Sequence, residues 1–217
     1  MHIDLVIIFS LSILVAGVIG MIRFSRIMKA YRPFIYLVWA ACINSLLNSV
    51  LLFYSKNVSP HNLIFDLCEA VFLIWFYKNM GAFRRTKPFF YVFIFVFAGI
   101  SLGEGIWGDY LGNTFHSWFR IFYSFLIVLL SINSINRIIL KEKDVFRNSA
   151  FLINIGTFVY FTYKGTIEIF WLYGLDINED FIRDVYMILL YINLFCNMIY
   201  SLAILWMRRQ QPVTLQF

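Results

Sequence analysis

Eight ionisable residues lie inside long apolar runs of this sequence, where a charge is costly. They are Asp66, Glu69, Glu104, Arg120, Lys164, Glu168, Arg183 and Asp184. Each charge within a membrane-spanning helix costs roughly 3 kcal/mol on insertion scales, so such residues are functional candidates by default. Asp66 and Glu69 are three residues apart, and Lys164 and Glu168 are four apart, so each pair shares one helix face. Groups of both signs in this pattern could bind a polar ligand, carry protons or act as general acid and base.

Membrane-spanning helices are the elements that must position these charges. The 217-residue chain is 61% hydrophobic and 14% charged, with a mean hydropathy of +0.77, whereas soluble domains are about half apolar and a quarter charged. Apolar runs near the ~20 residues that cross a bilayer predict seven spans. These are residues 5–23, 34–54, 62–80, 88–107, 115–137, 149–172 and 181–206. The sequence therefore predicts a single all-α integral membrane domain of seven transmembrane helices over residues 1–217.

Four basic clusters orient the predicted spans. Most of the 18 Lys and Arg residues fall within residues 23–32, 78–87, 137–147 and 208–209, at alternate breaks between the runs. The positive-inside rule then places the N-terminus outside and the C-terminus in the cytoplasm. The first run has no basic segment before it and is followed by Arg23 and Arg26, so we expect a retained anchor. The Ile-, Phe-, Asn- and Lys-rich composition indicates an AT-rich bacterial genome, and hence a bacterial inner (plasma) membrane.

All eight charges fall in the outer halves of their spans. With a rise of 1.5 Å per residue, their depths run from roughly 5 to 12 Å below the outer ends. We expect them to converge on a polar cavity open to the outside. The predicted ligand-binding residues are Asp66, Glu69, Glu104, Arg120, Lys164, Glu168 and Asp184. Arg183 is left out because it is adjacent to Asp184 and the two cannot both point inward. The alternative is that the charges pair with one another and lock the helices together.

Asparagines form a second polar layer. Asn44 and Asn48 are four residues apart, as are Asn193 and Asn197, and Asn154 lies in the sixth span. Side-chain amides hydrogen-bond between membrane helices at roughly 1 kcal/mol each, so we expect interhelical bonds. A polar relay from the outer cavity toward the cytoplasmic face is the alternative.

Several kinds of chemistry have no signal in this chain. There is no Walker A, GxGxxG, GxSxG or HExxH motif, and the three Cys residues lie within spans without CxxC spacing. No two of the three histidines share a helix at ligand spacing. We therefore predict no catalytic residues, no metal site and no cofactor. Basic residues in short loops are explained by topology and by anionic lipid, so we predict no nucleic-acid partner.

The predicted layout is similar, in topology only, to that of G-protein-coupled receptors, microbial rhodopsins and bacterial seven-helix sensor modules. The receptor DRY-type and NPxxY motifs are absent, and the third span ends in Phe76-Tyr77-Lys78. We predict a small sensor or receptor-like protein that binds a polar or amphipathic ligand from outside and signals to a separate cytoplasmic protein partner. Alternatives are a transporter or channel component, an intramembrane enzyme that uses Asp66 and Glu69, and a homo-oligomeric assembly protein.

Overall fold

The computed structural model describes residues 3–53, 59–83, 91–93, 95–96, 99, 114–142, 144–172 and 179–207, with backbone alone at 3–6, 52–53, 59–63, 114–117, 171 and 179–183. This part of the chain is helical. Its α-helices are α1 (Ile3–Leu11), α2 (Ile13–Arg23), α3 (Arg32–Phe53), α4 (Ser59–Asn79), α6 (Thr114–Ile139), α7 (Ser149–Leu172) and α8 (Glu179–Trp206). Short 3-10 helices lie at η1 (Phe24–Arg26), η2 (Lys29–Tyr31) and η3 (Val145–Arg147).

Five predicted spans match single helices, with small differences at their ends. The predicted span 34–54 is α3, 62–80 is α4, 115–137 is α6, 149–172 is α7 and 181–206 is α8. α4 begins at Ser59, earlier than predicted, because Pro60 lies in the first turn, where its missing N–H is no loss. The predicted span 88–107 lies largely outside the described residues.

The first predicted span is broken into two helices at Ser12. The Ser12 hydroxyl donates to the carbonyl of Phe9 at 2.6 Å, a bond that competes with the helical pattern and often bends a helix. The same hydroxyl accepts a 2.8 Å hydrogen bond from the Asn197 amide of α8. The break therefore also anchors the first span to the last helix.

Four helical segments are long and apolar enough to cross a membrane. Within the described residues these are Ile7–Arg26, Lys29–Leu51, Trp118–Ile139 and Asp184–Trp206. Two further long helices, α4 and α7, are not among these four segments, and they carry Asp66, Glu69, Lys164 and Glu168. The chain is therefore a helical integral membrane protein.

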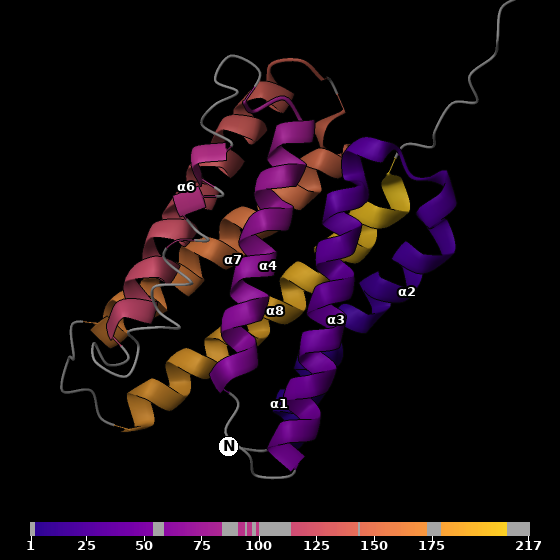
Figure 1. Ribbon diagram of the computed structural model, residues 1–217. Coiled ribbons are helices and arrows are strands. Elements are labelled where there is room, and N and C mark those ends of the chain that lie inside the picture. The colour runs from indigo at the N-terminus through magenta and orange to yellow at the C-terminus, as the bar shows by residue number, and fades with distance from the viewer. Residues whose placement is uncertain are drawn as a thin grey trace, which may run out of the picture.

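The directions of the helices follow from their contacts. α4 and α6 meet at Asp66–Arg120 and again at Tyr77–Ser131, so they run parallel. α2 and α8 are also parallel, since Ser12 meets Asn197 and Arg23 meets Ile204. In Figure 1, α4 and α6 rise side by side from the lower to the upper end of the bundle, with α7 descending behind them. The turn after α2 and the described ends of α4 and α6 meet at one end, since Tyr31, Met80 and Arg137 line one cavity there.

Small residues let three helix pairs approach closely. A Cβ on Gly17 would lie 2.6 Å from Cys42 Sγ, and one on Gly156 would lie 2.7 Å from Cε1 of Tyr200. A Cβ on Gly165 would lie 3.2 Å from Cβ of Ser124. Close backbone approach of this kind is how membrane helices associate, because lipid gives no hydrophobic drive between them.

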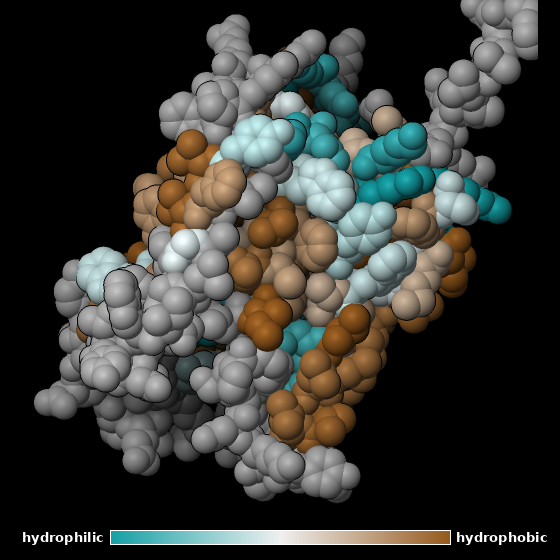
Figure 2. Space-filling model, in the orientation of Figure 1, coloured by the Kyte–Doolittle hydropathy of each residue, from teal (hydrophilic) through white to brown (hydrophobic). Residues whose placement is uncertain are grey.

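The exterior of the bundle is largely apolar. Large exposed side chains occur on α2, α3, α6 and α8, and Ile22 is 75% exposed. Figure 2 shows teal, hydrophilic residues gathered toward the upper right and brown, apolar ones below them. This distribution fits a bundle whose sides face lipid and whose end faces water.

Candidate functional site

A buried ionic cluster joins α4, α6 and α7. On α4, Asp66 Oδ2 accepts from Arg120 Nε of α6 at 2.8 Å, and Asp66 Oδ1 accepts from Lys164 Nζ of α7 at 2.9 Å. Lys164 Nζ also donates to Glu69 Oε2 at 2.8 Å. Arg120 Nη1 donates to Glu168 Oε1 at 3.1 Å, which ties α6 to α7. We call these five residues the ionic cluster; three acids and two bases give it a formal charge of −1.

Most of the ionic cluster is shielded from solvent, and Arg120, with 29% of its side chain exposed, is its most accessible member. The residues Asp66, Glu69 and Glu168 are at most 9% exposed, and the Lys164 side chain is 13% exposed. At this burial, charges are screened far less than surface charges, so breaking one pair is costly. The cluster therefore contributes to holding α4 against α6 and α7. Apart from these bonds, α4 packs more extensively against α3 than against α6 or α7.

Aromatic rings complete the surroundings of Lys164. Its Nζ lies 5.4 Å from the ring centroid of Tyr123, 5.8 Å from that of Tyr160 and 5.6 Å from that of Phe161. Ring faces attract a cation within about 6 Å of the centroid. The Tyr123 hydroxyl also donates to Glu69 Oε2 at 2.5 Å, so Glu69 and Lys164 share their neighbours.

Five of the charged residues come together as predicted, but they pair with one another, as in the alternative interpretation, and only Glu69 lines the cavity described below. Asp66, Glu69, Arg120, Lys164 and Glu168 form the ionic cluster. Lys164 and Glu168 are four residues apart on α7, but they do not pair with each other. Lys164 bonds the acids of α4, and Glu168 bonds Arg120 of α6. Asp184 lies outside these four ion pairs and has an exposed side chain on α8. Glu104 and the Arg183 side chain lie outside the described residues.

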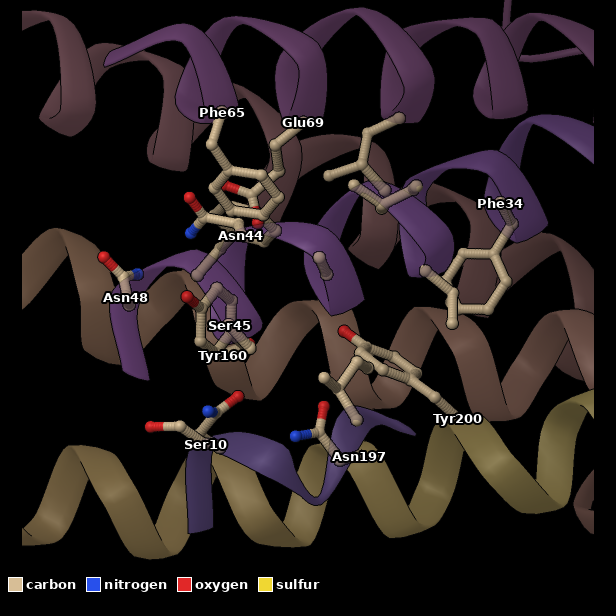
Figure 3. Close-up of a pocket in the computed structure, with 17 residues that line it drawn as sticks. Ser10, Phe34, Asn44, Ser45, Asn48, Phe65, Glu69, Tyr160, Asn197 and Tyr200 are labelled. Carbon is tan, nitrogen blue, oxygen red and sulfur yellow. The ribbon is translucent and has the colours of Figure 1, made fainter. Parts of the chain in front are cut away.

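A central cavity of about 200 Å³ adjoins the ionic cluster at Glu69. Figure 3 shows Asn44 and Asn48 of α3 on one side of it and Asn197 and Tyr200 of α8 on the other, with Glu69 and Phe65 above. Its apolar wall includes Phe34, Leu37 and Ile13. The cavity thus lies between the first, second, third, sixth and seventh predicted spans.

Amide groups face this cavity with hydrogen-bonding capacity to spare. Among the described residues, the side chains of Asn44 and Asn193 have no hydrogen-bonding partner, and both line the cavity. An amide offers two donors and an acceptor, and leaving them unmet inside a bundle is unfavourable. Water or a ligand is therefore the natural partner of these two groups.

The expected interhelical role of the asparagines holds only in part. Asn197 Nδ2 donates across helices to Ser12 Oγ at 2.8 Å. Asn154 Nδ2 instead donates to Ala150 O within its own helix, at 2.6 Å. Asn44 and Asn193 line the cavity, and the one sequence signal for this was that each lies four residues from a second asparagine, Asn48 and Asn197.

Hydroxyl groups continue the polar path toward the basic end. Tyr200, which lines the cavity, lies 3.5 Å from Thr157 Oγ1. The Tyr77 hydroxyl interacts with Thr157 and lies 2.6 Å from Ser131 Oγ. Nothing in the sequence pattern singled out these four residues, because isolated Ser, Thr and Tyr residues are common in membrane helices.

Other chemistry is not evident in the described part of the chain. No group of three His, Cys, Asp or Glu residues there is placed to hold a metal ion. Cys42, Cys68 and Cys196 are free thiols. Comparison with protein-family models, curated proteins and solved structures found no match to this chain. Its function must therefore be argued from the cavity and the ionic cluster.

Proposed function

We propose that this protein is a small seven-helix membrane sensor that binds a small neutral or cationic molecule in the central cavity. The observation that supports it most is that the cavity and the ionic cluster share Glu69. The ligand-binding residues are then Glu69, Asn44 and Asn193. The remaining members of the ionic cluster position Glu69 and respond to what it binds.

Helix direction supports seven crossings with the N-terminus outside. α4 and α6 run parallel, so if both cross the membrane, the chain between them crosses as well. α2 and α8 are also parallel, which requires an odd number of crossings between them, as the five intervening spans of a seven-span chain provide. Arg23 bonds the end of α8, and Arg137 and Lys141 lie at the end of α6 beside the turn that follows α2, so the positive-inside rule orients this end to the cytoplasm of a bacterial cell.

The lining of the cavity selects the class of ligand. It offers the Glu69 carboxylate, amides and hydroxyls beside aromatic rings, and no Lys, Arg or His among its described members. An anion would find no cation on this surface, because Lys164 bonds Glu69 but is not itself among the lining residues. The volume of about 200 Å³ is below the ~300–1,000 Å³ of pockets for drug-sized ligands. A small amine or polyol fits these limits.

The ionic cluster offers a way for binding to move a helix. Lys164 is surrounded by Glu69, Tyr160 and Phe161, and all three also line the cavity. A ligand that bonds Glu69 competes with Lys164 and alters the bond between α4 and α7. A ligand changes a conformational equilibrium only as far as it binds one state better, and this competition supplies that difference.

Movement of α4 would reach the basic end directly. α4 and α6 are tied at Asp66–Arg120, at Tyr77–Ser131 and, beyond the helix end, where Arg137 Nη1 donates to Gly81 O at 3.3 Å. A shift at the Asp66–Arg120 pair is therefore transmitted to Gly81 and Arg137 at the basic end. A separate cytoplasmic protein that contacts this end would read the change.

Ligand binding can be tested by thermal stabilisation of the purified protein in detergent. Small cationic, neutral and anionic compounds are screened separately. A compound present at 100 times its Kd stabilises the folded state by about 2.7 kcal/mol. We expect stabilising compounds among the cationic and neutral sets and none among the anionic set.

A matched pair of variants assigns the hits to the cavity. Ala41 lines the cavity, whereas its neighbour Ala40 does not. Ala41→Leu should fill the space and abolish stabilisation by the hits, and Ala40→Leu should leave it intact. Equal stabilisation of both variants, or hits that are mainly anionic, would overturn the proposed ligand site.

Transport is the second candidate, favoured by the hydroxyl path from Tyr200 through Thr157 to Tyr77. A path of polar groups below the cavity is what a carried proton or small solute would need. Proteoliposomes loaded with the screened ligand distinguish the two functions. If the protein is a sensor, the ligand leaves these proteoliposomes no faster than it leaves liposomes without protein. If the protein is a transporter, the ligand leaves faster.

A further inference from the structure

A second cavity, of about 300 Å³, lies at the basic end of the bundle. We call it the inner-end pocket. It is bounded by Met28, Ala30 and Tyr31 near η2, by Met80 after α4, by Ser134, Arg137, Ile138, Lys141 and Glu142 at the end of α6, and by Asn148, Ala150 and Asn154 at the start of α7. It is separate from the central cavity and shares no lining residue with it.

The charge of the inner-end pocket is positive. Arg137 and Lys141 face one carboxylate, Glu142, whose Oε2 accepts from Asn148 Nδ2 at 2.6 Å. Asn148 Oδ1 also caps α7, accepting from Ala150 N at 2.8 Å and Phe151 N at 3.2 Å. The positive end of the α7 dipole therefore points toward the same pocket.

Two polar atoms in this lining lack partners. Arg137 Nε and Asn154 Oδ1 are buried without a hydrogen bond among the described residues. The other Arg137 nitrogens bond weakly, at 3.3 Å, to Gly81 O and Ser134 Oγ. Unmet buried groups of this kind are rare and call for a partner. Here a donor and an acceptor are both unmet, so the partner should accept at Arg137 and donate at Asn154.

We propose that the inner-end pocket binds a phosphate group carried by an anionic, hydroxyl-bearing molecule. The phosphate oxygens accept from Arg137 and Lys141, and a hydroxyl donates to Asn154 Oδ1. Arg is well suited to phosphate because its planar fork can donate two bonds at once. A phosphatidylglycerol head group and a soluble glycerol phosphate both carry this chemistry. Basic pockets between helices at the cytoplasmic side are where anionic head groups bind.

Native mass spectrometry of the purified protein tests the site with phosphatidylglycerol, phosphatidylcholine and glycerol 3-phosphate as probes. We expect tighter retention of phosphatidylglycerol than of phosphatidylcholine. The double variant Arg137→Gln, Lys141→Gln should weaken it roughly 10- to 100-fold, the loss expected for charge-assisted hydrogen bonds. Arg26→Gln removes a neighbouring exposed charge outside the pocket and should change nothing.

Competition separates the two sources of phosphate. Displacement of the lipid by glycerol 3-phosphate assigns the pocket to a soluble ligand, and failure to displace assigns it to lipid. Equal losses in the Arg26 variant and the double variant would mean diffuse attraction and overturn the proposal, as would equal retention of phosphatidylcholine. If the double variant does not fold, Lys141→Gln alone decides, since this exposed side chain has no bonded partner in the described chain.

Discussion

Replacing Lys164 by Met removes the cation that Asp66 and Glu69 share. Met keeps most of the length of the side chain and its place among the rings of Tyr123, Tyr160 and Phe161. The loss is then mainly electrostatic. The formal charge of the ionic cluster changes from −1 to −2, and two buried carboxylates lose a hydrogen-bond donor.

The expected destabilisation is about 3–5 kcal/mol, the cost of leaving a buried charge without its partner. The side chain is only 13% exposed, so solvent screening does little to reduce this value. For a domain of this size the same change lowers Tm by roughly 6–20 °C. Thermal unfolding in detergent, followed by circular dichroism, measures it.

A second substitution separates charge from packing. Lys164→Met combined with Glu69→Gln returns the cluster to a formal charge of −1. If burial of unpaired charge is the cause, the double variant should lose less free energy of unfolding than the two single variants lose in sum. The difference should be about 0.5–3 kcal/mol. Lys29→Met removes an exposed lysine from η2 as a control. A Lys164 variant as stable as the Lys29 control would refute the account of the ionic cluster.

Three further predictions concern other parts of the bundle. Arg23 donates to the carbonyls of Ile204 and Leu205 at the end of α8, so Arg23→Gln should lower the free energy of unfolding by about 1.5–3 kcal/mol, whereas chemical denaturation of Arg26→Gln should match the wild type. Gly156→Ala places a Cβ against the Tyr200 ring, so Tm should fall by an amount that corresponds to about 1–3 kcal/mol. A cysteine introduced at Lys29, with the three native cysteines replaced, should react with an impermeant maleimide only in inverted vesicles; labelling of intact cells would contradict the proposed orientation.

The helices could be predicted from the sequence because their signal is local. Runs of apolar residues bounded by basic clusters gave ends within a few residues of those of α3, α6 and α7. The break at Ser12 could not be predicted this way, because a Ser hydroxyl can bond its own helix without breaking it, and the second bond here comes from Asn197 far along the chain. Local apolarity does not reveal which Ser residue will find such a partner.

Five of the eight charges could be predicted to meet, but most of their pairing could not. A charge in an apolar run needs a partner, and this requirement alone predicts that Asp66, Arg120 and Lys164 lie close together. The choice of partners depends on helix rotation and on the gap between α4 and α7, which a single sequence does not contain. The central cavity was missed for the same reason, since Asn44 and Asn193 line it only once three other helices are in place.

Ligand-induced movement of α4 relative to α6 is the most direct test of the proposed sensor. Spin labels at Asn79 and Leu140, both exposed at the basic end, would report the distance between the two helix ends by pulsed electron paramagnetic resonance. We predict that the strongest stabilising ligand shifts this distance distribution in the wild type and leaves it unchanged in Ala41→Leu. A saturating ligand that leaves the wild-type distribution unaltered would contradict the coupling of the cavity to the ionic cluster.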